Sequence, residues 1–184
     1  MPVNLEIKVK TDSHKEIKNI LKNIGAEFQG ILKQEDIYYK NKSGLLKLRI
    51  LQDRFELIRY NRDEKGNTRW SNYYVLDING KKVPEFLESL FPVETIVEKK
   101  RELWLFDNTR IHLDTVKGLG TFLELETLVI KGRKDAEKRF DKMVDVLRLD
   151  FKGQIRSSYR TLVLRSAKEK ERTVKQKSKG KKQV

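Results

Sequence analysis

The chain has 184 residues, of which 38% are hydrophobic and 37% are charged, and its net charge is +14. This length suits one domain with or without a tail, and the basic surplus suits either a polyanionic partner (nucleic acid, a nucleotide or polyphosphate) or a merely soluble basic surface. The chain has no cysteine and no apolar run near ~20 residues, which excludes disulfides, zinc–thiolate sites and a membrane-spanning helix.

Taken in chain order, apolar–polar alternation predicts strands and a 3.6-residue period predicts helices. A first strand at 3–10 places Leu5, Ile7 and Val9 on one side, and a helix follows within 12–28. The remaining strands are expected at 29–40, 45–51, 54–62, 68–78, 95–106, 109–116 and 121–130. Further helices are expected at 82–91, at about 135–147 and, as a short last helix, at about 157–166. The sequence therefore predicts an α+β protein with about eight mostly antiparallel strands.

Residues 167–184, called the tail below, contain eight Lys or Arg and two Glu. This polar, lysine-rich composition predicts disorder, so the expected organisation is one domain over 1–166 and a basic tail over 167–184. The tail could bind nucleic acid, direct nuclear import or only aid solubility. Nucleic-acid binding is not favoured because no aromatic residue interleaves the lysines. The N-terminal residues lack the apolar region of a signal peptide, so a cytoplasmic protein is expected, with a nuclear one as the alternative.

Several predicted strands devote one whole face to charges. Arg110, His112 and Asp114 share one face, and Glu124 and Glu126 share another. For any single strand, a solvated sheet face is the plain alternative. The charges nevertheless sort by sign, into the cations Lys8, Lys10, Lys47, Arg49, Lys99 and Arg101 and the carboxylates Glu6, Asp114, Glu124 and Glu126. If the strands close into a barrel, these faces meet inside it, where a triphosphate would neutralise the cations and Mg²⁺ or Mn²⁺ the carboxylates.

Seven landmarks follow one another along the chain: NLEIK, QEDIYY, LLKLR, VEKKR, RIHLD, GLGTFLELE and SSYRTL. With them the sequence, from about Val3 to Leu164, resembles the CYTH superfamily of triphosphate tunnel metalloenzymes. This superfamily includes class IV adenylyl cyclases, thiamine triphosphatases and inorganic triphosphatases, and the chain is most similar to its class IV adenylyl cyclase-like proteins. The resemblance implies an eight-stranded antiparallel closed barrel-like tunnel with peripheral helices.

The resemblance also implies roles for individual residues. The carboxylate group would hold one or two Mg²⁺ or Mn²⁺ ions, and the cation group would bind the triphosphate. The Glu-x-Glu-x-Lys motif of the first strand falls on Asn4, Glu6 and Lys8, so a neutral side chain fills its first position. Tyr38 lies where the triphosphatases carry a tyrosine tied to water activation. The partner lysine of that tyrosine falls within 59–62, and Arg62 is the residue assigned to this catalytic role.

The expected function is metal-dependent hydrolysis of a triphosphate, with tripolyphosphate, thiamine triphosphate or ATP as the substrate. The first alternative is a class IV adenylyl cyclase, in which the 3′-hydroxyl of ATP attacks the α-phosphorus. The second is a non-catalytic module that binds polyanions such as RNA. His112 is a candidate base, although a single strand histidine is more often structural. The sequence leaves a monomer and a homodimer open and predicts no membrane partner.

Overall fold

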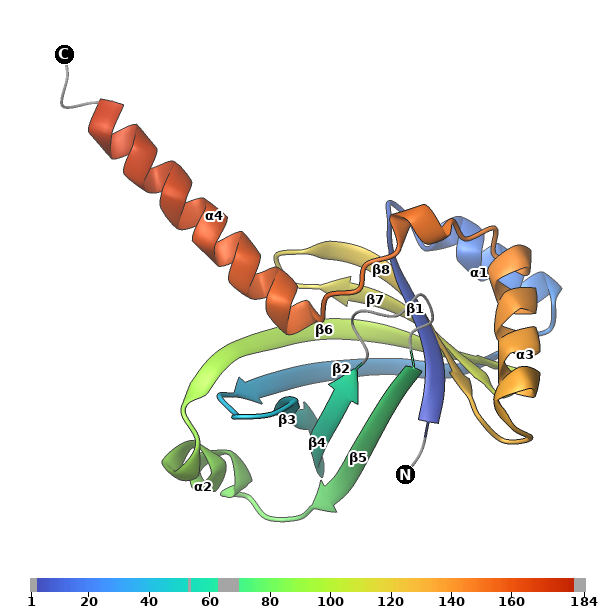
Figure 1. The fold of residues 1–184 in the computed structure, drawn as a ribbon, viewed down its shortest axis with the longest axis horizontal. Coiled ribbons are helices and arrows are strands. Elements are labelled where there is room, and N and C mark those ends of the chain that lie inside the picture. The colour runs from blue at the N-terminus through green and yellow to red at the C-terminus, as the bar shows by residue number, and fades with distance from the viewer. Residues whose placement is uncertain (1–2, 53, 63–69, 181–184) are drawn as a thin grey trace.

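The computed structural model describes residues 3–52, 54–62 and 70–180, and for a few of them, Arg62 included, only the backbone. Runs of consecutive strands are separated by single helices, and two helices follow the last strand (Figure 1). In order they are β1 (Val3–Thr11), α1 (Lys15–Asn23), β2 (Glu27–Tyr39), β3 (Leu45–Leu51), β4 (Arg54–Arg62), β5 (Trp70–Ile78), α2 (Val83–Leu90), β6 (Val93–Phe106), β7 (Thr109–Val116), β8 (Gly120–Leu128), α3 (Arg133–Val146), a 3-10 turn (Phe151–Gly153) and α4 (Tyr159–Gly180).

The strands close into one antiparallel barrel, in the order β1-β5-β4-β3-β2-β6-β7-β8, and β8 pairs back to β1. Pairing is most extensive between the two longest strands, β2 and β6, and it is shortest between β1 and β5. Short turns join β6 to β7 and β7 to β8. In the β7–β8 turn, Gly118 and Gly120 have φ values of 75° and 99°, which L side chains rarely adopt. The predicted fold class, an eight-stranded antiparallel barrel with peripheral helices, is confirmed.

The main hydrophobic core lies outside the barrel, between its wall and the helices. Ile7, Ile111 and Leu125 point outward from β1, β7 and β8, and they are fully buried together with Leu21 of α1 and Phe140 of α3. Burial of each such aliphatic side chain contributes roughly 1.5–3 kcal/mol to the stability of the folded protein. A second core cluster lies under α2, on the outer faces of β2 and β3. Because successive strand residues face opposite sides, placing the apolar set outward turns the charged set inward.

Helix α4 differs from the expected last helix. It continues to Gly180 and extends away from the barrel (Figure 1), where the sequence predicted an end near residue 166 and disorder beyond. The tail is rich in Lys, Arg, Glu and Gln, all of which have high helix propensity, so its charge does not prevent a helix. From residue 167 to 173 the side chains are exposed. Within the described ranges, no helix is long and apolar enough to cross a membrane.

Candidate active site

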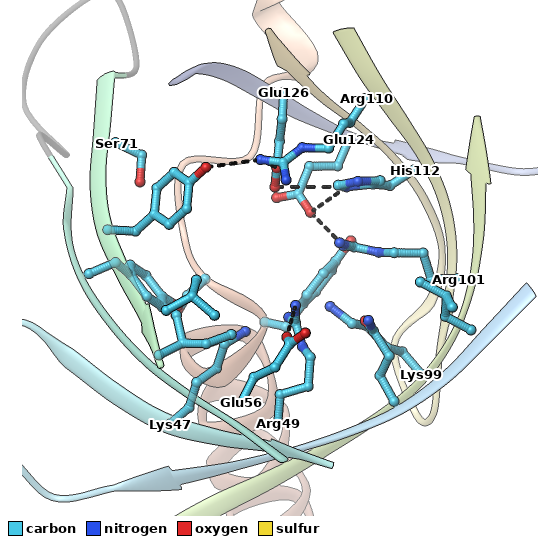
Figure 2. A pocket seen from close by; sticks show the side chains of 18 of the residues that line it. Lys47, Arg49, Glu56, Ser71, Lys99, Arg101, Arg110, His112, Glu124 and Glu126 are labelled. Atoms are coloured by element: carbon cyan, nitrogen blue, oxygen red, sulfur yellow. Dashed lines mark hydrogen bonds and ion pairs between the residues drawn. The ribbon is translucent and has the colours of Figure 1, made fainter. Parts of the chain in front are cut away.

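The inward faces of all eight strands enclose a cavity of about 330 Å³. Seven of its described lining residues are Lys or Arg and four are Glu, so the lumen is charged instead of apolar. At one end, Tyr159 in the first turn of α4 packs edge-on against Phe122, with the ring centroids 5.1 Å apart. Figure 2 shows the cations Lys47, Arg49 and Lys99 on one side of the lumen and Glu124 and Glu126 on the other.

Asp36, on the inward face of β2, joins three of the cations inside the barrel. Its carboxylate is fully buried and accepts hydrogen bonds from Lys47 Nζ (2.7 Å) and from Arg49 Nε (2.8 Å), while Lys99 Nζ lies 3.6 Å away. These cations come from β3 and β6, the two neighbours of β2, on which Asp36 lies. We call Lys47, Arg49, Lys99 and Arg101 the cation wall. Burial keeps these side chains from the mobile counterions of bulk water, so a fixed carboxylate holds them in place.

The pKa values of Asp36 and of its lysine partners reflect both their burial and the charges beside them. Burial raises the pKa of Asp36, but the charges of Arg49, Lys47 and Lys99 outweigh it and hold that pKa well below its usual value. Burial, with Arg49 close by, lowers the pKa of Lys47 well below that of a free lysine. Burial and the charge of Arg101 lower the pKa of Lys99 in the same way. Asp36 offsets this lowering only in part for both lysines, and an anion in the cavity would favour their protonated forms further.

Arg101 connects the cation wall with the acidic side of the cavity. Its guanidinium donates to both carboxylate oxygens of Asp114, at 2.7 and 2.6 Å, and to Glu124 Oε2 at 2.9 Å. The Tyr159 hydroxyl also donates to Asp114, at 3.0 Å. Burial raises the pKa of Asp114, but Arg101 and Lys99 bring it down to about 2. Asp114, expected from the resemblance to be a metal ligand, is thus placed among the cations, with both oxygens engaged.

His112, Glu124 and Glu126 form the acidic side, called the carboxylate–histidine group below. One donor atom of each lies within 4.8 Å of the others. The Arg110 guanidinium forms an ion pair with Glu126, with Nη2 2.8 Å from Oε2. Burial raises the pKa of Glu126, but His112 and Arg110 lower it to about 2. Burial, followed by the charge of Arg101, lowers the pKa of His112, so the imidazole is neutral at neutral pH.

The carboxylate–histidine group fits a divalent cation. His112 Nδ1 is buried and has no hydrogen-bond partner among the described residues, and carboxylate oxygens and neutral imidazole are common metal ligands. Glu6, also buried, lies directly opposite Glu126 in the β1–β8 ladder. The Asn4 side-chain oxygen is buried near the same end of β1 and likewise has no hydrogen-bond partner in the described part of the chain. These donors would hold an ion from the β1, β7 and β8 side of the cavity.

The two lysines predicted on β1 have different environments. Lys8 is buried in the cavity wall, where its Nζ donates to the Ser157 carbonyl (3.1 Å), lies 3.5 Å from Glu124 Oε1 and stands 4.3 Å from the Tyr159 ring centroid. Lys10 is exposed to solvent. Lys10 is paired with Phe122, and Tyr159 packs against Phe122 to close this end of the barrel. At Lys10, strand β1 therefore already lies beyond the closed end of the cavity.

The two predicted catalytic residues are separated by the strand register. Tyr38 is buried, lines the cavity and lies across from Lys47, whose Nζ is 5.5 Å from the tyrosine ring centroid. Lys47 is paired in turn with Ile58 of β4. Arg62 is four residues further along β4, or about 13 Å at the usual strand rise, and its side chain lies outside the described residues. The register therefore brings Lys47, and not the backbone of Arg62, to the level of Tyr38.

Sequence reasoning missed Asp36, Glu56 and Tyr73. Asp36 alternates with Gln34 and Tyr38 on β2, and that period could have indicated an inward face. Glu56 lies beside Arg49, with its Oε2 3.9 Å from the guanidinium. The Tyr73 hydroxyl accepts a hydrogen bond from Arg110 at 3.3 Å.

Comparisons with known proteins agree with this architecture. A protein of Methanocaldococcus jannaschii named as a candidate adenylate cyclase is 27% identical over 167 residues, covering 79% of this chain and 88% of its own. The PH1012 protein of Pyrococcus horikoshii superposes with a TM-score of 0.73 at 22% identity, covering 86% of this chain and 98% of its own. HpAC1 from Hippeastrum, an adenylyl cyclase candidate described with a dominant triphosphatase activity, superposes with a TM-score of 0.64 at 14% identity, covering 91% and 96%. The sequence profile of the CYTH domain matches residues 3–159, and the chain therefore belongs to the CYTH domain family.

Proposed function

We propose that this protein is a metal-dependent phosphohydrolase that binds the phosphate chain of a triphosphate inside the barrel. The observation that carries the proposal is the division of one lumen into a cation wall and a carboxylate–histidine group that face each other. A triphosphate carries several negative charges on a short chain of oxygens, and it would replace the counter-charge that the cation wall draws from Asp36. Tripolyphosphate, thiamine triphosphate and ATP all offer this chain.

The side chains divide the work between binding and charge stabilisation. The planar guanidiniums of Arg49 and Arg101 suit two-point contacts with phosphate oxygens, and Lys47 and Lys99 supply compact charges between them. Being fixed before the substrate arrives, they need no reorganisation as charge builds on the leaving oxygen. When bound at the carboxylate–histidine group, Mg²⁺ or Mn²⁺ supplies a Lewis acid for phosphate oxygens. Tyr38, with Lys47 in the place of the predicted Arg62, is the residue that we propose to orient the attacking water.

Adenylyl cyclase activity is the second candidate, and the name of the Methanocaldococcus jannaschii relative favours it. The same cation wall would serve it, because both reactions need charge stabilisation along a triphosphate. Hydrolysis is preferred because it requires contacts with the phosphate chain alone, and HpAC1, which shares the fold, is described with a dominant triphosphatase activity. A cytoplasmic location suits these substrates. The predictions of a monomer or homodimer and of nucleic-acid binding by the tail stay predictions.

Product analysis tests the proposal. The purified protein is incubated with tripolyphosphate, thiamine triphosphate and ATP, each with Mg²⁺ or with Mn²⁺. Orthophosphate release that depends on the metal is the expected result, whereas cyclic AMP with pyrophosphate would establish the cyclase instead. Glu124→Gln should reduce turnover by at least about a hundredfold. Glu98→Gln is the matched control, since this glutamate lies on the outer surface and pairs only with the exposed Lys117 among the described residues.

Neighbouring lysines on β6 test the cation wall separately. Lys99 is buried in the cavity, and Lys100 is exposed on the other face of the same strand. Lys99→Met should raise the KM for tripolyphosphate by roughly 10- to 150-fold, the equivalent of a charge-assisted hydrogen bond of about 1.5–3 kcal/mol. Lys100→Met should leave the KM unchanged. Equal effects of the two substitutions, or the absence of turnover with every substrate and metal, would refute the proposal.

A further inference from the structure

The imidazole of His112 lies between two carboxylates without bonding to either. Its Nδ1 is 3.9 Å from Glu124 Oε2 and 3.8 Å from Glu126 Oε1, and both distances are too long for a hydrogen bond. The side chain is only 4% exposed, and Nδ1 has no hydrogen-bond partner among the described residues. A buried polar atom without a partner costs about 1–3 kcal/mol. The fold nevertheless directs this nitrogen at the two oxygens (Figure 2).

A cation between the three donors would account for this spacing. Two donors that each lie about 2.0–2.2 Å from one ion can be at most about 4.4 Å apart, and they come closer as the angle at the ion narrows. The measured separations of 3.8 and 3.9 Å fall inside that limit. Neighbouring arginines also contact the carboxylates, Arg110 at Glu126 Oε2 and Arg101 at Glu124 Oε2. Glu124 Oε2 is also the oxygen nearest to Nδ1, so an ion there would share it with Arg101. Glu126 Oε1, the oxygen that faces the imidazole, is not the one that Arg110 contacts.

We infer that His112 Nδ1 is a direct ligand of the divalent ion and that it makes the site select imidazole-binding transition metals over Mg²⁺. This inference rests on the metal site of the proposed function and adds the ligand that sets its preference. Carboxylates and water suit Mg²⁺ and Mn²⁺, whereas imidazole favours ions further along the first transition row. The site should therefore bind Co²⁺ and Zn²⁺ much more tightly than Mg²⁺, and that difference should depend on His112.

The test measures metal binding without substrate. Affinities for Mg²⁺, Mn²⁺, Co²⁺ and Zn²⁺ are determined by titration calorimetry for the wild type and for His112→Phe and His112→Asn, whose folding is checked by thermal unfolding. Removing a partner behind a metal ligand typically costs ~10–100-fold in affinity, so losing the ligand itself should weaken Co²⁺ and Zn²⁺ by at least that factor. The affinity for Mg²⁺ should change less than about threefold, because Mg²⁺ gains little from imidazole.

A spectroscopic measurement on the unaltered protein keeps the inference testable if a variant does not fold. Pulsed electron paramagnetic resonance of the Mn²⁺-loaded protein should show coupling to an imidazole ¹⁴N nucleus. The coupling should disappear in His112→Asn and persist in His14→Asn, which replaces the chain's second histidine. His14 lies before α1, with its Nε2 3.1 Å from the Phe122 carbonyl.

The outcomes separate this inference from the proposed function. Wild-type protein without a nitrogen coupling, or variants with unchanged Co²⁺ and Zn²⁺ affinity, would overturn the ligand assignment even if triphosphate hydrolysis is observed. Conversely, tight Co²⁺ binding through His112 in a protein that hydrolyses no triphosphate would establish the ligand and refute the proposed hydrolase.

Discussion

Asp36→Asn should be the most damaging single substitution that leaves the shape of the cavity unchanged. Asparagine has almost the same size as aspartate, so the change removes a charge and little volume. Lys47, Arg49 and Lys99 would then lie in a buried cluster without the carboxylate that contacts them at 2.7, 2.8 and 3.6 Å. The substitution therefore isolates the electrostatic role of Asp36 from its packing.

The expected loss can be estimated from comparable cases. Removing one partner of a buried ion pair typically costs about 3–5 kcal/mol, because the remaining charge keeps its desolvation penalty without compensation. For a chain of this length, each kcal/mol shifts the melting temperature by about 2–4 °C, so Asp36→Asn should lower the Tm by roughly 6–20 °C near neutral pH. Burial already lowers the pKa values of Lys47 and Lys99, so their deprotonation would relieve part of this destabilisation. A decrease in Tm near the smaller end of the range is therefore expected.

The pH dependence follows from the lowered pKa of Asp36. A carboxylate whose pKa is lower in the folded state stabilises the protein fully above the unfolded value, here 3.8, and this contribution is lost as the pH falls through the folded pKa. The difference in free energy of unfolding between the wild type and Asp36→Asn should therefore be complete above about pH 5 and shrink in stronger acid. Thermal and urea unfolding across pH 3–8 measure it.

Tripolyphosphate provides a second measurement on the same variant. A ligand that binds only the folded protein stabilises it by about 2.7 kcal/mol at 100 times its Kd. Because the cations of Asp36→Asn lack their internal counter-charge, tripolyphosphate should raise its Tm more than it raises that of the wild type. Glu35→Gln, on the outward face of the same strand, is the control and should behave as wild type. A Tm loss below about 2 °C, or equal rescue of both proteins, would refute the role assigned to Asp36.

Three further predictions test other parts of the structure. Tyr159→Phe removes the hydroxyl that donates to Asp114 and should lower the free energy of unfolding by about 1.5–3 kcal/mol in urea, and an unchanged value would contradict that bond. The pKa of Glu126 is about 2 in the folded protein and 4.5 in the unfolded chain, so the stability that its carboxylate contributes is complete above about pH 4.5 and is lost towards pH 2. In metal-free Glu126→Gln, the free energy of unfolding should therefore depend less on pH between 4.5 and 2 than it does in the wild type. The same pH dependence in both proteins would count against this role. Deleting residues 167–184 should change the free energy of unfolding by less than about 0.5 kcal/mol and leave turnover intact, and a larger loss in either would refute a domain boundary at 166.

Alternation along the strands made the barrel and most of the charged lumen predictable. The same period that directs Leu123 and Leu125 outward places Glu124 and Glu126 inside, and their meeting with Lys99 and Arg101 needs only that the sheet closes. Such a pattern is local, and it survives errors of one or two residues at the strand ends.

The pairings inside the lumen could not be read in this way, because they depend on which strands become neighbours. Asp36 acquires its cations only because β3 and β6 flank β2 in a particular register. Asp114 is drawn to Arg101 by the β6–β7 register, which places the two residues directly opposite. Lys10 continues the alternation of β1 but lies beyond the end that Tyr159 closes. The helical tail was missed for a different reason, since its composition satisfies the signatures of both disorder and a charged helix.

The hydrophobic core packs outside the barrel wall, and the charged lumen lies within it. Alternate residues of each strand therefore serve two separate purposes, packing on the outer face and lining the lumen on the inner face. Inserting or deleting one residue within a strand such as β8 would exchange its two faces. Glutamates would then point into the hydrophobic core, and leucines would point into the substrate cavity. Frame-preserving exchanges of inward residues, by contrast, leave the helix-covered side untouched. Divergence of specificity within this architecture should therefore proceed by substitution along fixed strands, with changes in length confined to the turns.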